Sequence, residues 1–472
     1  MISFNTTCRW SVASLSLIMM LGLYGPAANA VVGDPVGGEV LVNTSTLFDQ
    51  ENTAVVINPA GDFEVLWEGI DLDTGDYGIY AQRYNADGTS SGGETRINTT
   101  LLNDQTFPKT AVNADGSFIV VWEDSDDNGD FNVYARRFNA DGSASGGNFR
   151  VNSVVISSLT SETVPAVGID SAGNFTVAWE SYDDVNGDDD IYARRFDASG
   201  TALSPEFRVN TEIANDQMLP AMAMSAVGDF VVVWQSAAQD SDGSTGIYAQ
   251  RYNATGTPVG GEFRVNTTTA NEQTMATVAM SGAGDFIVAW QSAAQDSDGS
   301  TGIYAQRFDA IGTLVGGEFR VNTEIGNDQT TPVAAINTVG DLLMAWESMA
   351  QDGDGKGIYA QRYDTTGTAV GGEFRVNTTT AQAQMLPAAA INADLDMVVA
   401  WQSYGQDNIR HPSYGIYAQR YLGNNLIASS SNVSSSGSGG GGALGWLGIM
   451  LILPAWYRRR RPTPLWRAAH AD

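Results

Sequence analysis

Cysteine and histidine are almost absent from this chain. The only cysteine is Cys8, and the only histidines are His411 and His470. An exported form that lacks the first 30 residues would therefore have neither disulfide bonds nor thiol chemistry. Catalytic triads and histidine-ligated metal sites are poorly supported for the same reason. The fold must be held together by packing, and paired carboxylates are the catalytic groups that remain.

Basic residues are scarce relative to acidic ones. Residues 1–30 and 458–472 hold 6 of the 24 basic residues and 1 of the 54 acidic residues, so the rest of the chain has a net charge of −35. This charge argues against nucleic acid as a partner, because the phosphates would be repelled. Nearly all the basic residues are arginines at repeated positions, such as Arg251 and Arg264. We expect them to form ion pairs within the fold.

The chain is built from a long repeat. The segment from Gly228 to Tyr252 returns almost letter for letter between Gly284 and Phe308. Its tryptophan recurs with steps of 55, 57, 55, 56, 56 and 55 residues, at Trp67, Trp122, Trp179, Trp234, Trp290, Trp346 and Trp401. Seven copies of one unit of this length predict a repeat architecture in which neighbouring units bury each other.

One unit contains four segments with the pattern of β-strands. In the copy from Met218 to Asn266 we expect strands at 220–225, 230–235, 247–252 and 263–267. The second segment is almost continuously apolar, which is typical of a strand that is covered on both faces. Four antiparallel strands that recur about every 55 residues are typical of propeller blades. The sequence therefore predicts an all-β, seven-bladed β-propeller with a buried tryptophan in each blade.

The two ends of the array indicate how the ring closes. The last unit stops after its third strand, Gly415 to Tyr421, and a copy of the missing fourth strand stands ahead of the first unit, from Gly37 to Thr44. This N-terminal strand would complete blade seven and remove an exposed sheet edge. The alternative is an open solenoid with a frayed end.

The segments outside the propeller, 37–421, have their own patterns. Residues 1–30 have an apolar stretch and end in Ala-Asn-Ala, which predicts a secretory signal cleaved before Val31. A Ser/Gly-rich linker is expected at 422–442. An apolar stretch with an arginine cluster follows at 443–461, and we expect it to be a transmembrane helix that leaves the propeller outside the cell. Residues 462–472 form a short tail.

The C-terminal segments resemble a known sorting signal. From Ser429 to Arg461 the linker, glycine run, apolar stretch and arginine cluster are similar to the GlyGly-CTERM segments of exported gammaproteobacterial proteins. The resemblance implies processing by a rhombosortase and type II secretion toward the cell surface. The sequence departs from it in the eleven residues from Pro462 to Asp472. An ordinary single-span anchor is the alternative.

The blade repeat has a resemblance of its own. The motifs Gly-Glu-Phe-Arg-Val-Asn and Gly-Ile-Tyr-Ala-Gln-Arg-Tyr, spread between Gly37 and Tyr421, resemble repeats of large bacterial surface and calcium-associated proteins. The resemblance implies a surface context, and it brings no catalytic motif.

Acidic residues gather in the loops that follow the tryptophan strands and in the crossovers between units. In a propeller these two sets of loops emerge on the same face. One loop comes close to the first half of a calcium-binding loop, with candidate ligands Asp124, Asp126, Asn128 and Asp130 and with Gly129 between the last two. The second half fails, because Ala135 stands where a bidentate glutamate is needed. Solvated turns are the alternative to calcium.

Together these patterns predict an exported, surface-associated binding or adhesion module without catalytic activity, which calcium would stabilise if the acidic loops hold the ion. Its ligand would be a glycan, a protein or a matrix component. The alternative is a carboxylate-dependent glycoside hydrolase or lyase on a propeller scaffold. Catalysis would need residues that break the repeat. The visible departures, at 183–190, Lys356 and 408–414, form no recognisable acid/base pair.

Overall fold

The computed structural model describes residues 34–127, 129–153, 161–182, 187–240, 242–407 and 412–423. No helix among these residues is long and apolar enough to cross a membrane. The predicted signal at 1–30, the linker beyond residue 423, the anchor at 443–461 and the tail at 462–472 lie outside the described residues. They remain predictions.

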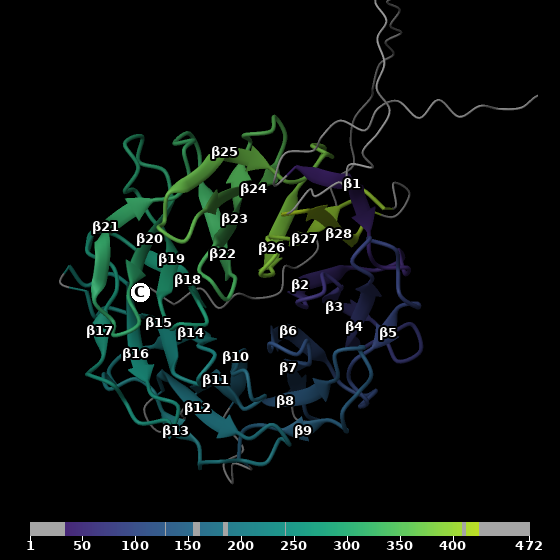
Figure 1. The fold of residues 1–472 in the computed structure, drawn as a ribbon, viewed down its shortest axis with the longest axis horizontal. Helices are drawn as coiled ribbons and strands as arrows, with labels where there is room; N and C mark the ends of the chain where they lie inside the picture. The colour runs from purple at the N-terminus through teal and green to yellow at the C-terminus, as the bar shows by residue number, and fades with distance from the viewer. Residues whose placement is uncertain are drawn as a thin grey trace, which may run out of the picture. The chain divides into compact units, whose positions relative to one another are not determined.

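The described residues form 28 strands in seven antiparallel sheets of four, and the sheets are arranged as the blades of a ring (Figure 1). The all-β, seven-bladed propeller predicted from the repeat is thus confirmed. Blade 1 contains β2 (Gln50–Ile57), β3 (Phe63–Ile70), β4 (Tyr77–Tyr84) and β5 (Thr95–Arg96). Blade 2 contains β6 (Gln105–Val112), β7 (Phe118–Ser125), β8 (Phe131–Phe138) and β9 (Phe149–Arg150). Blade 3 contains β10 (Glu162–Ile169), β11 (Phe175–Tyr182), β12 (Asp189–Phe196) and β13 (Phe207–Arg208).

The remaining blades follow the same order. Blade 4 contains β14 (Gln217–Met224), β15 (Phe230–Ser236), β16 (Gly246–Tyr252) and β17 (Phe263–Arg264). Blade 5 contains β18 (Gln273–Met280), β19 (Phe286–Ser292), β20 (Gly302–Phe308) and β21 (Leu314–Arg320). Blade 6 contains β22 (Gln329–Ile336), β23 (Leu342–Met349), β24 (Lys356–Tyr363) and β25 (Ala369–Arg375). Blade 7 contains β26 (Gln384–Ile391), β27 (Met397–Tyr404), β28 (Tyr414–Tyr421) and, from the other end of the chain, β1 (Pro35–Leu41).

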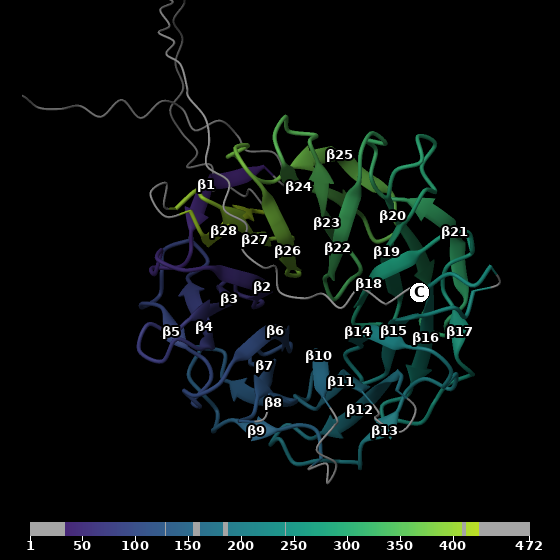
Figure 2. The same cartoon turned by 180° about the vertical axis from the view of Figure 1, so that it is seen from behind.

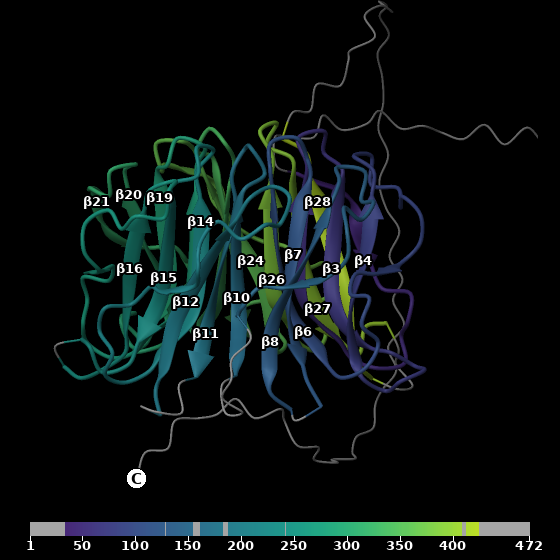
Figure 3. The same cartoon turned by 90° about the horizontal axis from the view of Figure 1, so that it is seen from below.

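The first strand of each blade lies innermost and the fourth lies at the rim (Figure 2). The strands run between the two faces of the ring (Figure 3). Residues near the start of a first strand, the end of a second strand and the start of a third strand therefore meet on one face. This arrangement decides which side chains can form a site.

Blade 4 shows where strand prediction succeeded and where it missed. The second and third strands agree with the prediction to within a residue. The first strand begins three residues earlier than expected, at Gln217, because the register shifts between Met218 and Ala221. The bulge places Leu219 at φ 52°, a conformation that non-glycine residues seldom adopt.

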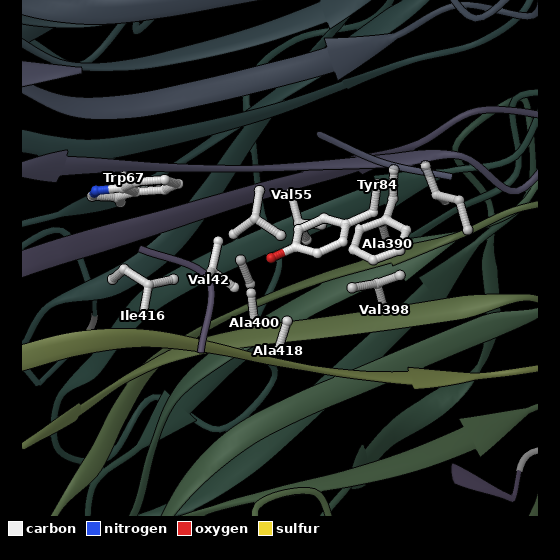
Figure 4. Packing of buried hydrophobic residues seen from close by; sticks show 13 residues of the cluster. Val42, Val55, Trp67, Tyr84, Ala390, Val398, Ala400, Ile416 and Ala418 are labelled. Atoms are coloured by element: carbon white, nitrogen blue, oxygen red, sulfur yellow. The ribbon is translucent and has the colours of Figure 1, made fainter. Parts of the chain in front are cut away.

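The core lies between the blades. The seven repeat tryptophans are 0 to 1% exposed, so the predicted burial is confirmed. Each cluster joins side chains of two neighbouring blades, as between blades 7 and 1, where Val42 of the closing segment, Val55 and Ile416 pack near Trp67 (Figure 4). A stacked aromatic pair belongs to the cluster between blades 3 and 4: the ring centroids of Phe230 and Tyr252 are 4.8 Å apart.

The ring is closed by its N-terminal strand. β1 pairs antiparallel with β28 and completes the sheet of blade 7, as predicted, so the open-solenoid alternative is wrong. Asn43 Oδ1 then accepts a hydrogen bond from the backbone N–H of Ile416 at 2.7 Å. The same bond joins Asn266 and Ile247 within blade 4 at 2.8 Å. The closing segment thus reproduces the contacts that a covalently continuous blade makes.

The arginines have structural roles, although only some form ion pairs. Arg264 lies 3.8 Å from Asp240 of its own blade, as expected. Arg251 instead donates from Nη2 to the carbonyl of Ala310 in the next blade at 2.7 Å. The guanidinium of Arg251 is thus bound by a carbonyl group of the next blade and not by a carboxylate. Arginines of this kind link neighbouring blades but do not neutralise acidic residues.

Candidate functional site

The loops after the second strands and the crossovers between blades share one face, which we call the loop face. The backbone N–H of Tyr77, at the start of a third strand, donates to Asp104 of the following crossover at 3.0 Å. Asn103 N–H of that crossover donates to Asp76 at 3.1 Å. The prediction that the acidic loops gather on one face is confirmed.

Many of these acids are already used in holding the loops. Asp240 is buried and accepts hydrogen bonds from Tyr248 Oη at 3.1 Å and from Asn266 Nδ2 at 2.7 Å. Asp242 accepts from the hydroxyl and N–H of Ser244. Fewer carboxylates of the loop face are therefore free to bind a ligand than the sequence predicts, because loop carboxylates such as these accept hydrogen bonds from donors of their own blade.

The candidate calcium loop lies partly within the described residues. Asp124 belongs to strand β7, is 7% exposed, and accepts a bond from Trp122 Nε1 at 3.4 Å. Asp126 Oδ1 accepts from the N–H of Asp130 at 3.1 Å within the turn. Asn128 lies outside the described residues, and no cluster of three or more possible metal-ligating acids, histidines or cysteines occurs among those described. Calcium binding remains a prediction.

A ring of hydrogen bonds links every blade to the next. The residue after each repeat tryptophan is Glu or Gln, and its side chain accepts from the N–H of the bulge residue in the following blade. The donors and acceptors are Asn52 and Gln402 (3.1 Å), Phe107 and Glu68 (2.7 Å), Val164 and Glu123 (2.6 Å), Leu219 and Glu180 (2.8 Å), Met275 and Gln235 (3.3 Å), Thr331 and Gln291 (3.2 Å), and Leu386 and Glu347 (2.8 Å). We call these seven acceptors the acceptor ring.

The acceptor ring explains the unusual backbone of the bulges. All seven donors have φ between 48° and 55°, including the β-branched Val164 and Thr331. Such a conformation is costly outside glycine and persists only where the surroundings impose it. The hydrogen bond is that constraint. The four bonds to carboxylates are shorter than the three bonds to amides, as expected for charge-assisted or strongly polarised acceptors.

Burial sets the protonation of the ring carboxylates. It raises the pKa of Glu68 and Glu123 to about 7 and that of Glu180 to about 8. In blade 6, Lys356 Nζ lies 2.5 Å from the carboxylate of Glu347. Three neighbouring blades thus hold carboxyl groups that change charge near neutral pH.

The raised pKa values predict that stability falls as pH rises. A carboxyl group that keeps its proton longer in the folded state contributes stability that is present below pH 4.5 and is lost as pH rises through 7 to 8. Glu123→Gln with Glu180→Gln should therefore flatten the decline of the free energy of unfolding between pH 5 and pH 8, by on the order of 3 kcal/mol per group, and with it the decline of the melting temperature. Glutamine at this position in three other blades indicates that the fold accepts it.

The control for this experiment is Glu272→Gln, which changes an exposed carboxylate on the same face. It should leave the pH profile of melting unchanged. A double variant whose melting temperature falls between pH 5 and pH 8 as steeply as the parent's would contradict the assignment of the pH dependence to the acceptor ring.

Glu51 is the departure from the repeat that turns the acceptor ring into a candidate site. It pairs across the strands with Glu68 in blade 1. The equivalent neighbours of the other acceptors are Thr106, Thr163, Met218, Thr274, Thr330 and Met385. Directly paired residues present their side chains on the same sheet face, with Cβ atoms about 5 Å apart. Blade 1 therefore has two carboxyl groups side by side where every other blade has at most one.

The surroundings of Glu51 are aromatic and negatively charged. Burial, followed by the charges of Asp49 and Glu68, raises the pKa of Glu51 to about 7. The pKa values of Tyr77 and Tyr414 are raised to about 12 by burial and then by Glu51. The Glu51 carboxylate makes no hydrogen bond or ion pair with any residue that the structure describes.

Tyr404 completes this group. Its ring lies 5.1 Å from that of Tyr414, tilted by 58°, and it is 36% exposed. We call Glu51, Glu68, Tyr77, Tyr404 and Tyr414 the Glu51 site. It lies on the loop face where blades 7 and 1 meet.

The grooves on the opposite face are weaker candidates. The larger one lies between the turns of blades 1 and 2 and is lined by Asp62, Asp115 and Asp141, among others. These carboxylates accept hydrogen bonds from Ala86, Ser117 and Ser143 in the adjoining turns. They are used to hold the turns, whereas Glu51 is not.

The fold and the site define a seven-bladed β-propeller with a carboxylate pair at one blade junction. No family model and no curated protein matches the chain. It is similar to the solved structure of a protein of unknown function from Dyadobacter fermentans, at 12% identity over 83% of this chain and 99% of that one, with a TM-score of 0.49.

Two further solved structures are named as enzymes. The GH93 α-L-arabinofuranosidase of Fusarium graminearum is 9% identical over 83% of this chain and 98% of its own, with a TM-score of 0.47. The α-L-arabinanase of Penicillium chrysogenum is 12% identical over 81% and 98%, with a TM-score of 0.44. At these levels the similarity concerns the fold and transfers neither residues nor substrate.

The prediction that this chain has no catalytic activity has to be corrected. The solved structures to which it is similar include proteins named as an α-L-arabinanase and an α-L-arabinofuranosidase. The departures from the repeat found in the sequence, at 183–190, Lys356 and 408–414, did not include Glu51. Glu51 lies within a strand, and only the register of β2 and β3 shows that it faces Glu68.

Proposed function

We propose that the chain is a carboxylate-dependent glycoside hydrolase that uses Glu51 and Glu68. The observation that carries this proposal is the side-by-side pairing of two carboxyl groups, both with pKa values raised to about 7, in the one blade that breaks the repeat. Glycoside hydrolysis needs one carboxylic acid and one carboxylate flanking the scissile bond. Near neutral pH such a pair can share a single proton.

The contacts of the two groups assign their roles. Glu68 accepts the N–H of Phe107 at 2.7 Å, which holds the carboxylate in place and favours its ionised form. Glu51 has no described donor and is flanked by Asp49 and Glu68, so it retains its proton more readily. Glu51 would donate the proton to the leaving oxygen. Glu68 would act as nucleophile or as the base that activates water.

Substitution of either carboxylate tests the proposal. Glu51→Gln and Glu68→Gln should each lower kcat/KM for release of reducing ends from a glycan panel at least 100-fold, roughly the contribution of one acid or base. Glu51→Gln should also remove the alkaline limb of the pH–rate profile, because that limb reports loss of the acid's proton.

Glu180→Gln is the matched control, since Glu180 occupies the position of Glu68 in blade 3 but faces Thr163. It should leave the activity unchanged. A parent protein inactive on every glycan tested, or a Glu51→Gln variant as active as the parent, would refute the proposed function.

We also propose that the propeller works outside the cell. The signal predicted at 1–30 and the tail that resembles GlyGly-CTERM support export, with attachment through 443–461 until the tail is processed. A polymeric glycan is a suitable substrate in that setting, because it is too large to be imported intact.

A further inference from the structure

Both ends of the described propeller lie on the face opposite the loop face, which we call the turn face. This face carries the turns between the first and second strands and between the third and fourth strands of each blade. Pro35, at the start of β1, pairs with Tyr421, at the end of β28. Two residues further on, the N–H of Gly423 donates to Asp396, in the turn between β26 and β27, at 3.1 Å. A segment attached to either end therefore starts from the turn face.

The length of the predicted linker favours a membrane on the side of the turn face. Between Gly423 and the apolar stretch that begins at Ala443 there are 19 residues, and Ser and Gly are the commonest among them. A Ser/Gly-rich chain of this length spans about 24 Å on average. A strand of eight residues is itself about 27 Å long. With the loop face against the membrane, the linker would use its whole average span in returning along the ring. With the turn face against the membrane, no such path is needed.

Apolar side chains stand at the tips of the turns in blades 4 to 6. Val227, Ile311 and Val339 are 71, 77 and 63% exposed, and we call these three residues the turn-face patch. The same tip positions hold acids in blades 1, 2 and 7, namely Asp87, Asp115, Asp141 and Asp394. The blade repeat therefore does not require apolar residues at these tips. Exposed apolar patches are typical of surfaces that contact another molecule or a membrane.

Hydrogen bonds between the turns hold the three tips close together. Val227, Ile311 and Val339 each follow a residue that bonds to the turn between β18 and β19 of blade 5. These bonds run from Ala226 N–H to Gly282 O (3.2 Å), from Gly282 N–H to Thr338 O (3.1 Å) and from Ala310 N–H to Asp285 Oδ1 (2.9 Å). The turn-face patch is thus one continuous surface over three blades.

The loop face also has exposed apolar side chains, such as Leu72 and Leu102, so the ends of the chain decide between the two faces. We propose that the turn-face patch rests on the lipid surface of the membrane that holds the predicted anchor. The loop face, with Glu51 and Glu68, then points away from the lipid. The inference rests on the proposed attachment through 443–461. An uncharged lipid surface fits best, because anionic lipids would repel the net charge of −35 outside the termini.

A fluorescent dye that is quenched by lipid provides a direct test. The exported chain, residues 31–472, has no cysteine, so a nitrobenzoxadiazole dye can be attached at Ile311→Cys or at Val339→Cys alone. In phosphatidylcholine vesicles, spin-labelled lipid should quench either dye roughly threefold more than a dye at Leu102→Cys on the loop face, because only the patch would enter the lipid interface. Aqueous iodide should show the reverse order. Equal quenching by lipid at the three positions, or stronger quenching at Leu102→Cys, would overturn the inference.

Aspartate substitutions show whether apolar contact holds the patch on the lipid. Val227→Asp with Ile311→Asp, in the chain labelled at Val339→Cys, should reduce quenching by lipid to the level of Leu102→Cys, because moving a charge out of water is costly. The matched control is Leu72→Asp with Leu102→Asp, which places two charges on the loop face and should leave the quenching at Val339→Cys unchanged. An equal loss of quenching in both double variants would contradict the inference. Thermal melting of each variant shows that it is folded.

Attachment, docking and hydrolysis are measured separately. Flotation with the vesicles reports attachment, and a chain that stays in solution would refute both the anchor and the docking of the turn-face patch. Flotation with equal quenching on the two faces would refute the docking alone. Release of reducing ends from soluble glycans reports the hydrolase and depends on neither result.

Discussion

Deletion of Gly37 to Thr44 is expected to lower the melting temperature sharply and to broaden the unfolding transition. The deletion removes most of β1 and leaves β28 as an unpaired edge. It also removes Val42, which is 2% exposed in the core between blades 7 and 1. Differential scanning calorimetry measures both effects.

The size of the effect follows from the contacts that are lost. Val42 donates its N–H to the carbonyl of Ile416 at 2.8 Å, and Asn43 accepts from Ile416 at 2.7 Å. Glu39 accepts from Thr378 at 2.7 Å in the preceding blade. Burial of one valine and these hydrogen bonds together contribute roughly 5 kcal/mol.

A peptide covering residues 34–44 provides the control. Added to the truncated ring, it should restore part of the melting temperature in proportion to its concentration, because it binds only the folded state. A peptide of the same composition in scrambled order should not. An unchanged melting curve for the truncated ring would show that β1 does not hold the ring closed.

Replacement of a repeat tryptophan by alanine should cost about 3 to 5 kcal/mol, the range for truncation of a large buried aromatic. Trp234 is the best position to examine. It is completely buried, and its neighbours come from two blades, so the cavity cannot collapse without moving a whole sheet. Unfolding of Trp234→Ala by heat or denaturant measures the loss.

Phenylalanine substitutions separate packing from hydrogen bonding. Trp234 Nε1 donates to Gln217 Oε1 at 2.8 Å, whereas Trp401 Nε1 has no hydrogen-bond partner among the described residues. Trp234→Phe should therefore cost about 1 kcal/mol more than Trp401→Phe, because it leaves Gln217 without its donor. Equal costs would show that the indole N–H contributes nothing, and a mild effect of Trp234→Ala would contradict interblade burial.

The fold could be predicted because each level of the sequence indicates the same answer. The tryptophan spacing counts the blades, the apolar run of 230–235 identifies a strand buried on both faces, and the stray copy at 37–44 identifies the closing strand. The blade pattern is local and occurs seven times, so a strand that is misassigned in one copy can be corrected by comparison with the other copies. In blade 4 the second and third strands agree with the prediction. The first strand begins earlier, because of the bulge at Leu219, and the fourth, predicted at 263–267, spans only Phe263–Arg264.

The site could not be predicted in the same way, because it depends on register and on contacts between blades. Nothing in the letters around Glu51 shows that it faces Glu68, or that Tyr414, more than 360 residues away, lies beside it. Comparison of Glu51 with its equivalents Thr106 and Met218 would have been the only signal. The acids of the loops misled the sequence argument, since residues such as Asp240 serve as acceptors within their own blades.

The seam in blade 7 also has a kinetic consequence. Asn43 and Ile416 are 373 residues apart, so their contact cannot form until nearly the whole propeller has been synthesised. Closing a loop of this length carries an entropy cost of roughly 5 kcal/mol, which makes it a late step in folding. Until then β1 is an unpaired strand and the sheet of blade 7 has a vacant edge. At high protein concentration the two can meet between different chains, so domain-swapped dimers are the expected misfolded product of this architecture.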